Sequence, residues 1–256
     1  MKQEALKAKI KERYGKIALE GNSESCCGPE CCSSTEADPQ MSSVVVGYDG
    51  KALESIPKSS ILGLGCGAPI NFANLKIGEI VVDLGSGPGI DAFLASREVK
   101  DNGKVIGIDF TDEMLHKATS AAKENGFTNV EFRKGDIEDS IPVDDNSVDV
   151  AISNCVINLA TDKVKTFKEI YRILKKDGKG RMIISDLVTS KEIRGDSVNP
   201  EDWCSCIDGA LTKENYINSI KEAGFSDVKT LNEQIYITED KTNRIITSVV
   251  IGATAK

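Results

Sequence analysis

The pattern of apolar and polar positions separates an irregular first quarter of the chain from a regular remainder. Short apolar runs bounded by glycine or polar residues predict buried strands, and longer segments with apolar positions three or four apart predict helices. The two kinds of segment alternate from residue 79. The expected strands are 79–84, 104–109, 129–133, 147–153, 179–186, 228–238 and 245–255, and the expected helices are 90–99, 111–125, 162–175 and 212–223.

This alternation predicts an α/β fold with a doubly wound, Rossmann-like sheet of seven strands and helices on both faces. Only the polar turn 239–243 separates the last two strands, so we expect them to form an antiparallel hairpin at the edge of an otherwise parallel sheet. The predicted domain covers residues 76–256, with an irregular insertion at about 187–211.

The first 75 residues predict an extension of this domain. Residues 2–20 have helical spacing of apolar positions, whereas residues 21–43 are polar and include four cysteines. Residues 44–74 mix short apolar runs with glycine and proline. We therefore expect an N-terminal helix, a cysteine-rich loop and a lid segment over residues 1–75.

Composition narrows the function classes. A net charge of −8 argues against nucleic-acid binding, which requires clustered Lys and Arg. The N-terminus lacks an apolar signal region, and no window reaches the length of a membrane span, so we expect a cytoplasmic protein without membrane contact. In that reducing compartment, eight cysteines are more typical of reactive or metal-binding thiols than of disulfides. One histidine, His116, argues against a His-rich metal site.

A glycine-rich turn, VDLGSGPG at residues 82–89, follows the first predicted strand. Glycines at this position let the backbone turn sharply and approach a ligand. The spacing is G-x-G-x-G, which differs from the G-x-G-x-x-G turn that binds pyrophosphate. The acid before it, Asp83, suits a ligand with an ammonium group.

Two further acidic positions end the next strands. Asp109 closes the second strand, about 20 residues after the turn, where an acid suits a pair of ribose hydroxyls. Asp136 follows the third strand in the segment GDIED. The carboxyl ends of adjacent strands share one rim of the sheet, so these acids are expected to line one ligand site.

Residues 79–186 resemble class I S-adenosylmethionine-dependent methyltransferases on these motifs. The resemblance implies S-adenosylmethionine as the cofactor, with glycines of the turn near its methionine part, Asp109 at the ribose, and Asp136 and Ile137 at the adenine. The expected cofactor contacts are Asp83, Gly85, Ser86, Gly87, Gly89, Asp109, Phe110, Asp136, Ile137 and Asn154. A phosphate-binding or NAD-binding domain is the alternative.

The cysteines indicate the acceptor. Cys66 lies between two glycines, Cys155 directly follows the fourth strand, and Cys204 and Cys206 lie in the irregular stretch after the fifth. The strand end and the flexible loops allow thiols from three regions to converge. Thiolates prefer soft centres such as trivalent arsenic, which keeps a lone pair when three sulfurs bind it.

The segments GLGCGAP, SNCVINL and CIDGAL resemble arsenite methyltransferases of microbes and animals. The resemblance covers about residues 62–228. It implies that Cys66, Cys155 and Cys206 bind trivalent arsenic at the insertion, and that arsenite gains methyl groups.

It also implies a catalytic N-terminal cysteine in disulfide exchange with a thiol reductant, either a thioredoxin-like protein or a small thiol. Cys32 is the representative candidate for this cysteine. Cys26, Cys27 and Cys31 remain open beside it.

Two other functions remain open. A methyltransferase for another small acceptor, such as a quinone or an organic thiol, would contain these cysteines only as small buried side chains. A thiol-rich metal-binding protein without catalysis would use the CCGPECC cluster, whose spacing suits zinc. Trp203 is expected to be a packing residue and His116 a solvated one.

Overall fold

The computed structural model describes residues 3–20, 38–193, 199–237 and 243–256. Four cysteines of the predicted loop, Cys26, Cys27, Cys31 and Cys32, therefore lie outside the described residues. The strands are β1 (Ile80–Leu84), β2 (Lys104–Asp109), β3 (Val130–Lys134), β4 (Val150–Asn154), β5 (Arg181–Thr189), β6 (Ser226–Ile237) and β7 (Ile246–Thr254). The α-helices are α1 (Gln3–Glu20), α2 (Pro39–Val45), α3 (Gly50–Leu53), α4 (Ile90–Val99), α5 (Asp112–Glu124), α6 (Lys163–Ile173), α7 (Pro200–Cys204) and α8 (Lys213–Glu222). Three short 3-10 helices are η1 (Lys58–Ser60), η2 (Pro69–Phe72) and η3 (Ile157–Leu159).

The strands form one sheet in the order β3-β2-β1-β4-β5-β7-β6. Strands β1 to β5 pair in parallel, whereas β7 pairs antiparallel with both β5 and β6. This arrangement confirms the predicted doubly wound sheet and its antiparallel closing pair. The order reverses between β1 and β4, and a crevice opens outside the carboxyl ends of the strands at such a point.

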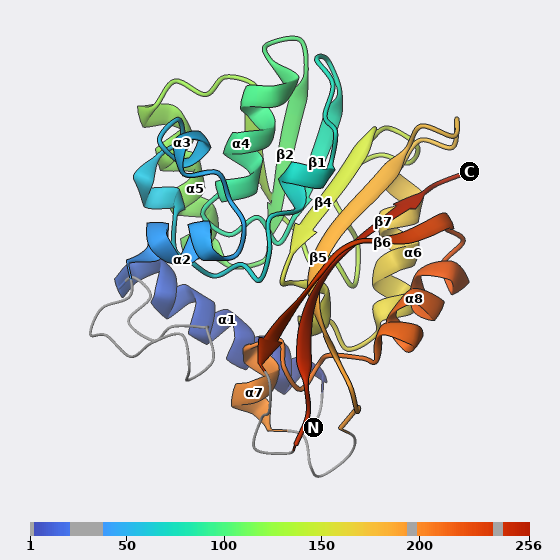
Figure 1. The fold of residues 1–256 in the computed structure, drawn as a ribbon. Coiled ribbons are helices and arrows are strands. Elements are labelled where there is room, and N and C mark those ends of the chain that lie inside the picture. Colours follow the sequence, from blue (N-terminus) through green and yellow to red (C-terminus); the bar gives the residue numbers. More distant parts are fainter. Residues whose placement is uncertain (1–2, 21–37, 194–198, 238–242) are drawn as a thin grey trace.

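Helices cover both faces of the sheet (Figure 1). On one face α6 and α8 pack against the strands, and Phe167 and Tyr216 meet edge to face within that core. On the other face α4 lies on the central strands, and Phe93 continues the core toward α5. Alternate residues of each central strand face the two layers, so neither face of β1, β2 or β4 is exposed to solvent.

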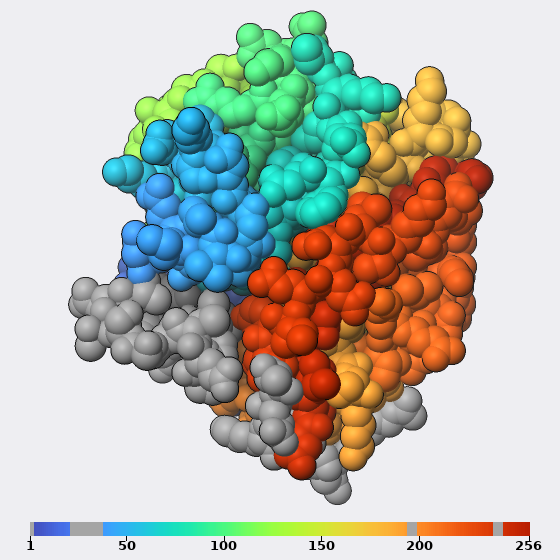
Figure 2. Space-filling view, in the orientation of Figure 1, coloured from blue at the N-terminus to red at the C-terminus, as the bar shows by residue number. Residues whose placement is uncertain are grey.

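The N-terminal elements lie over the carboxyl ends of the strands. Helix α1 packs against α5 and α7, and Figure 1 shows α1 beside α7 on the lower side of the molecule. Residues 61–73 cross toward the last strands, where the Ser248 hydroxyl donates to the Cys66 carbonyl at 2.6 Å. Figure 2 shows the blue and cyan residues after position 38 next to the red strands of the C-terminal part.

The expected irregular stretch 187–211 contains regular secondary structure among its described residues. Strand β5 continues to Thr189 because it pairs with β7 along its whole length, ending at the Thr189–Ile246 pair. The segment also contains α7, which Asn199 caps by accepting from the Glu201 N–H. A helix of five residues is too short to show a periodic pattern, so the sequence did not predict it.

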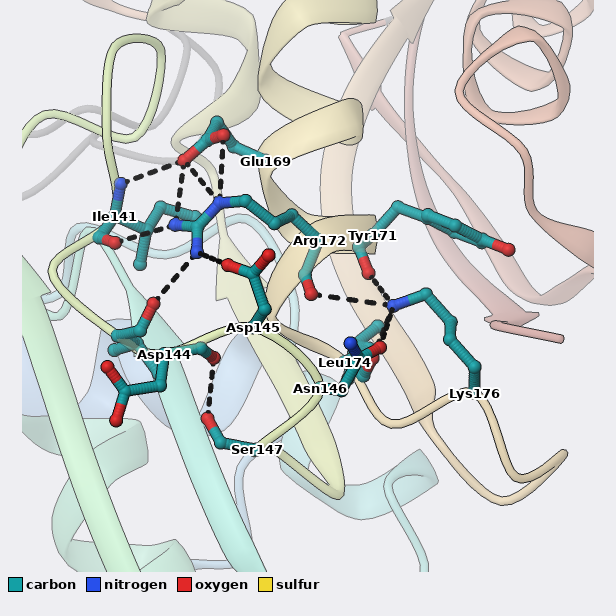
Figure 3. Close-up of polar contacts among 11 residues, drawn as sticks. Ile141, Asp144, Asp145, Asn146, Ser147, Glu169, Tyr171, Arg172, Leu174 and Lys176 are labelled. Atoms are coloured by element: carbon teal, nitrogen blue, oxygen red, sulfur yellow. Dashed lines mark hydrogen bonds and ion pairs between the residues drawn. The ribbon is translucent and has the colours of Figure 1, made fainter.

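The opposite rim of the sheet is closed by Arg172 at the end of α6. Its guanidinium binds Glu169 and Asp145 and donates to the Ile141 and Val143 carbonyls at 2.8 and 2.9 Å. Figure 3 shows the Arg172 side chain pointing into the loop that leads to β4. The nearby Lys176 ammonium donates to backbone carbonyls at the end of α6. The Arg172 guanidinium thus has carboxylate and carbonyl partners on every side of the loop, which indicates a structural role.

Candidate active site

One pocket lies at the carboxyl ends of β1, β2 and β4, where the strand order reverses. Nine of the ten residues predicted to contact a cofactor line it: Asp83, Gly85, Ser86, Gly87, Asp109, Phe110, Asp136, Ile137 and Asn154. Gly89 does not line the pocket. It is the N-cap of α4 with φ of 99°, so its contribution is to turn the chain into that helix.

Two buried acids stand side by side in this pocket. The side chains of Asp83 and Asp91 are each 2% exposed, and Oδ2 of Asp83 and Oδ1 of Asp91 have no hydrogen-bond partner among the described residues. Burial, and next the neighbouring Asp91 charge, hold the pKa of Asp83 well above its ordinary value. Burial also raises the pKa of Asp91 to about 6. Unpaired buried acceptors of this kind favour a cationic ligand.

The third acid is fixed by the glycine turn. The two oxygens of Asp109 accept from the backbone N–H groups of Gly87 at 2.9 Å and Thr111 at 2.8 Å. Positive φ values of 66° at Gly85 and 51° at Gly87 bring the turn into this position. Asp109 therefore presents a fixed carboxylate at the end of β2, with spare acceptor capacity toward the pocket.

Helix α1 forms one wall of the pocket. Lys7, Ile10 and Tyr14 line it, and the Lys7 ammonium lies 2.6 Å from Asp136 and 3.2 Å from Glu138. This contact could not be predicted from the sequence, because the acids are more than 120 residues away along the chain. Asp136 thus lines the pocket as predicted, but one of its oxygens already has a cationic partner.

The three predicted thiols converge beside the pocket. Cys66, Cys155 and Cys206 belong to one small cluster that also contains Leu187 and Ala210. Cys66 is 3% exposed and Cys206 is fully buried, while Cys155 lines both the cluster and the pocket. The Cys206 thiol donates to the Cys155 carbonyl at 3.0 Å. Cys155 is thus where the two parts of the site meet.

The glycines around Cys66 are required by close packing. A Cβ at Gly65 would lie 2.6 Å from Nδ2 of Asn154, and one at Gly67 would overlap the Ser185 hydroxyl. Asn154 holds this loop, since its Oδ1 accepts from the Cys66 N–H at 3.2 Å and its Nδ2 donates to the Gly67 carbonyl at 2.7 Å. The pattern G-C-G therefore lets the thiol loop lie directly against β4 and β5.

The backbone and the environment of the thiols are both unusual. Cys155 and Cys206 have φ of 59° and 65°, a left-handed conformation that is uncommon for residues with a side chain and that concentrates at functional sites. The adjacent Cys206 and Cys66 thiols, together with burial, raise the pKa of Cys155 well above its ordinary value. Contact with Cys155 lowers the pKa of Cys206, but burial and Asp186 outweigh it and the net shift is upward. Without a bound ligand, these two thiols are protonated at neutral pH.

Cys204 lies in a different place from Cys206. It packs with Leu6 and Ile10 of α1, away from the three clustered thiols. Only the flanking CIDGAL motif distinguished the two cysteines in the sequence, and the structure separates them spatially.

Several residues next to the site were not among those predicted from the sequence. Asp186 is fully buried on β5, and one of its oxygens lies within 4.8 Å of the Cys66 and Cys155 sulfurs. Lys163 is 7% exposed, and its ammonium lies 5.6 Å from the centre of the Trp203 ring. Tyr48 donates to Asp91 at 2.6 Å. An acid at a strand end was a usable signal for Asp186, but its pairing with thiols depends on tertiary structure.

The fold is that of a Rossmann-like methyltransferase. Residues 75–224, more than half of the chain, match the family described as "Methyltransferase domain". The chain belongs to this methyltransferase family. Among the described residues, no helix is long and apolar enough to cross a membrane.

Similar proteins extend the comparison. The chain is 42% identical to an arsenite methyltransferase of Halobacterium salinarum, over 86% of this chain and 57% of the relative. It is 33% identical to an arsenite methyltransferase of Aquipseudomonas alcaligenes, over 88% and 63%. The chain thus spans less than two thirds of the length of these curated relatives.

A solved structure is also similar. The crystal structure of an arsenic(III) S-adenosylmethionine methyltransferase from Chlamydomonas reinhardtii superposes with a TM-score of 0.65 at 29% identity. The match covers 85% of this chain and 74% of that one. The resemblance inferred from the three cysteine motifs is confirmed by these similarities.

Proposed function

We propose that this protein transfers a methyl group from S-adenosylmethionine to arsenite held by the thiolates of Cys66, Cys155 and Cys206. The observation that carries the proposal is the convergence of these thiols, from three distant segments, at the edge of the cofactor pocket. The similarity to arsenite methyltransferases supports the same acceptor.

The pocket residues fit the cofactor. Oδ2 of Asp83 and Oδ1 of Asp91 are buried acceptors without a partner among the described residues, and the ammonium group of the methionine part would satisfy them. Asp109 would accept from the ribose hydroxyls, and Asp136 and Ile137 would contact the adenine. Bound S-adenosylmethionine supplies an electrophilic methyl group on a sulfonium centre.

The thiol cluster fits the acceptor. Three sulfurs match the three-coordinate geometry of trivalent arsenic, and a neutral arsenic–trithiolate complex suits a cluster lined by Leu187 and Ala210. The thiols can bind arsenite although their pKa values are raised. Each arsenic–sulfur bond forms as an arsenite hydroxyl leaves as water together with the thiol proton. Cys155 lines both sites, so it would place the acceptor next to the methyl donor.

Further parts of the proposal concern the whole catalytic cycle. Residues at about 187–211 would form the insertion that binds the acceptor, since they contribute Cys206 and Leu187. An N-terminal cysteine, represented by Cys32, together with a small thiol or a thioredoxin-like protein, would return arsenic to the trivalent state. A reducing cytoplasm would keep all of these thiols available.

Release of S-adenosylhomocysteine by the purified protein tests the proposal. With excess thiol, release should depend on arsenite, and Cys155→Ser and Cys206→Ser should each abolish it. Cys204→Ser is the matched control, because that thiol lies two positions from Cys206 but in another cluster. Release that ignores arsenite or survives both substitutions would instead indicate another small acceptor, such as a quinone or an organic thiol.

A further inference from the structure

A buried carboxylate lies against two of the clustered thiols without a part in the function proposed above. The Cys66 sulfur, the Cys155 sulfur and one oxygen of Asp186 all lie within 4.8 Å of one another. Three donors fix the carboxylate: the Asn158 and Leu187 N–H groups at 3.0 and 2.9 Å and the Tyr216 hydroxyl at 3.0 Å. Two sulfurs and an oxygen thus face one point.

We propose that Cys66, Cys155 and Asp186 form a binding site for a tetrahedral divalent metal ion, Zn²⁺, which overlaps the arsenite site. Zinc binds sulfur at about 2.3 Å and carboxylate oxygen at about 2.0–2.2 Å, which places its ligand atoms roughly 3.5 Å apart. Because the three atoms already lie within 4.8 Å of one another, a contraction of no more than about 1.3 Å forms the site. Three protein ligands leave the fourth position to water.

The charge of the site favours such an ion. Zn²⁺ with two thiolates and one carboxylate carries a net charge of −1, which is costly to bury without a counter-ion. The Lys163 ammonium supplies one, because it is buried next to the cluster and interacts electrostatically with Asp186 and Cys206. It donates to the Ala160 carbonyl at 3.1 Å, which holds it in place.

The two ligands use different sets of residues. Arsenite would take three sulfurs, from Cys66, Cys155 and Cys206. Zinc would take Asp186 in place of Cys206, whose thiol can keep its hydrogen bond to the Cys155 carbonyl. Because two thiols are shared, the two ligands exclude each other and zinc would act as a competitor of arsenite. The competition rests on the proposed arsenite ligands, whereas zinc binding by Cys66, Cys155 and Asp186 requires neither arsenite nor methyl transfer.

Metal titration of the full chain tests the site. The protein would carry serine at positions 26, 27, 31 and 32, so that thiols outside the described residues do not bind the metal. Added Cd²⁺ is a suitable probe for zinc because its thiolate charge-transfer absorption reports binding. Arsenite is titrated separately through the fluorescence of Trp203, which is the only tryptophan of the chain.

We expect the two substitutions to affect the two ligands in opposite ways. Asp186→Asn should weaken Cd²⁺ binding by at least about tenfold and leave arsenite binding nearly unchanged, whereas Cys206→Ser should do the reverse. Lys163→Met should weaken Cd²⁺ more than arsenite, because only the metal complex is charged. Cys204→Ser and Asp149→Asn are controls that should change neither affinity, since Asp149 lies at the other end of β4.

Two results would overturn the proposal: an unchanged Cd²⁺ affinity in Asp186→Asn, or simultaneous binding of Cd²⁺ and arsenite. If Asp186→Asn fails to fold, the cadmium NMR shift of the protein with Asp186 intact decides the matter. A shift typical of mixed sulfur and oxygen ligands supports the site, and one typical of sulfur alone contradicts it.

Discussion

At the residue scale, the buried acids beside the glycine turn favour ligand binding at the expense of stability. Asp83→Asn should weaken S-adenosylmethionine binding about 10- to 100-fold, because a hydrogen bond to a charged group contributes roughly 1.5–3 kcal/mol. The same change should raise the free energy of unfolding of the ligand-free protein at pH 7, since it removes a buried acid with a raised pKa. Calorimetric titration and thermal unfolding measure the two effects, and a loss of both affinity and stability would contradict this account.

The raised pKa of Asp91 predicts how the free energy of unfolding depends on pH. Its pKa rises from 3.8 to about 6 on folding, so the folded state holds its proton more tightly. The resulting stability is fully present below pH 3.8 and is lost as the pH rises through about 6. Between pH 5 and 7 the free energy of unfolding should fall, and Asp91→Asn should reduce that fall by on the order of 1 kcal/mol. Denaturant unfolding at the two pH values measures the slope, and identical slopes would show that Asp91 is not the group responsible.

The residues of the site differ in how far the sequence could predict them. Asp83, Asp109 and Cys155 were predictable because each stands at or next to a strand end, and parallel strand ends share one rim. Asp186 also ends a predicted strand, but its contact with the thiols, like the burial of Lys163, depends on tertiary structure and could not be predicted. Their roles arise from neighbours in space that are distant in sequence.

At the scale of elements, α1 forms one wall of the cofactor pocket. Ile10 is 2% exposed and lines the pocket, so Ile10→Ala should weaken the docking of α1 by about 2–4 kcal/mol. Hydrogen exchange in residues 3–20 should become faster and cofactor affinity should fall. Leu19→Ala is the matched control on the same helix, because that side chain is 76% exposed. Equal effects of both substitutions would contradict the role given to the buried face of α1.

Helix α6 supports the opposite rim and should affect stability alone. Arg172→Met removes the Arg172 hydrogen bonds and ion pairs from two carbonyls and two carboxylates, at a cost of about 2 kcal/mol. Thermal unfolding should show this loss, while the arsenite-dependent turnover measured at a temperature where the variant is folded should not change. A fall in turnover under that condition would mean that this rim communicates with the site.

Long elements were predicted well from the sequence and short ones were not. The seven strands and the helices α1, α4, α5, α6 and α8 have enough residues to show a period. Strand β5 was expected to end at residue 186, but it runs to Thr189 because Thr189 pairs with Ile246 of β7. This pairing could not be predicted, since β7 lies far along the chain. The position of α1 over the pocket could not be predicted either, because it depends on contacts distant in sequence, such as the packing of Ile10 with Cys204 and the pairing of Lys7 with Asp136.

At the scale of the whole molecule, the topology explains why distant cysteines meet. Cys155 follows β4 at the point where the strand order reverses, and the loop of Cys66 crosses this rim to reach β7. The stretch after β5 returns to the same rim and brings Cys206. A sheet with this order therefore places the three thiols beside the cofactor pocket, as the proposed transfer to a thiol-bound acceptor requires.

The most direct test of this account is the product itself. The purified protein is incubated with arsenite, excess thiol and S-adenosylmethionine that carries a deuterated methyl group. The arsenic species are then separated, and their masses are measured by mass spectrometry. The account predicts methylated arsenic that carries the deuterated methyl group, and no such product from Cys155→Ser. Deuterated methyl groups found only on other acceptors, or methylated arsenic formed equally by Cys155→Ser, would contradict it.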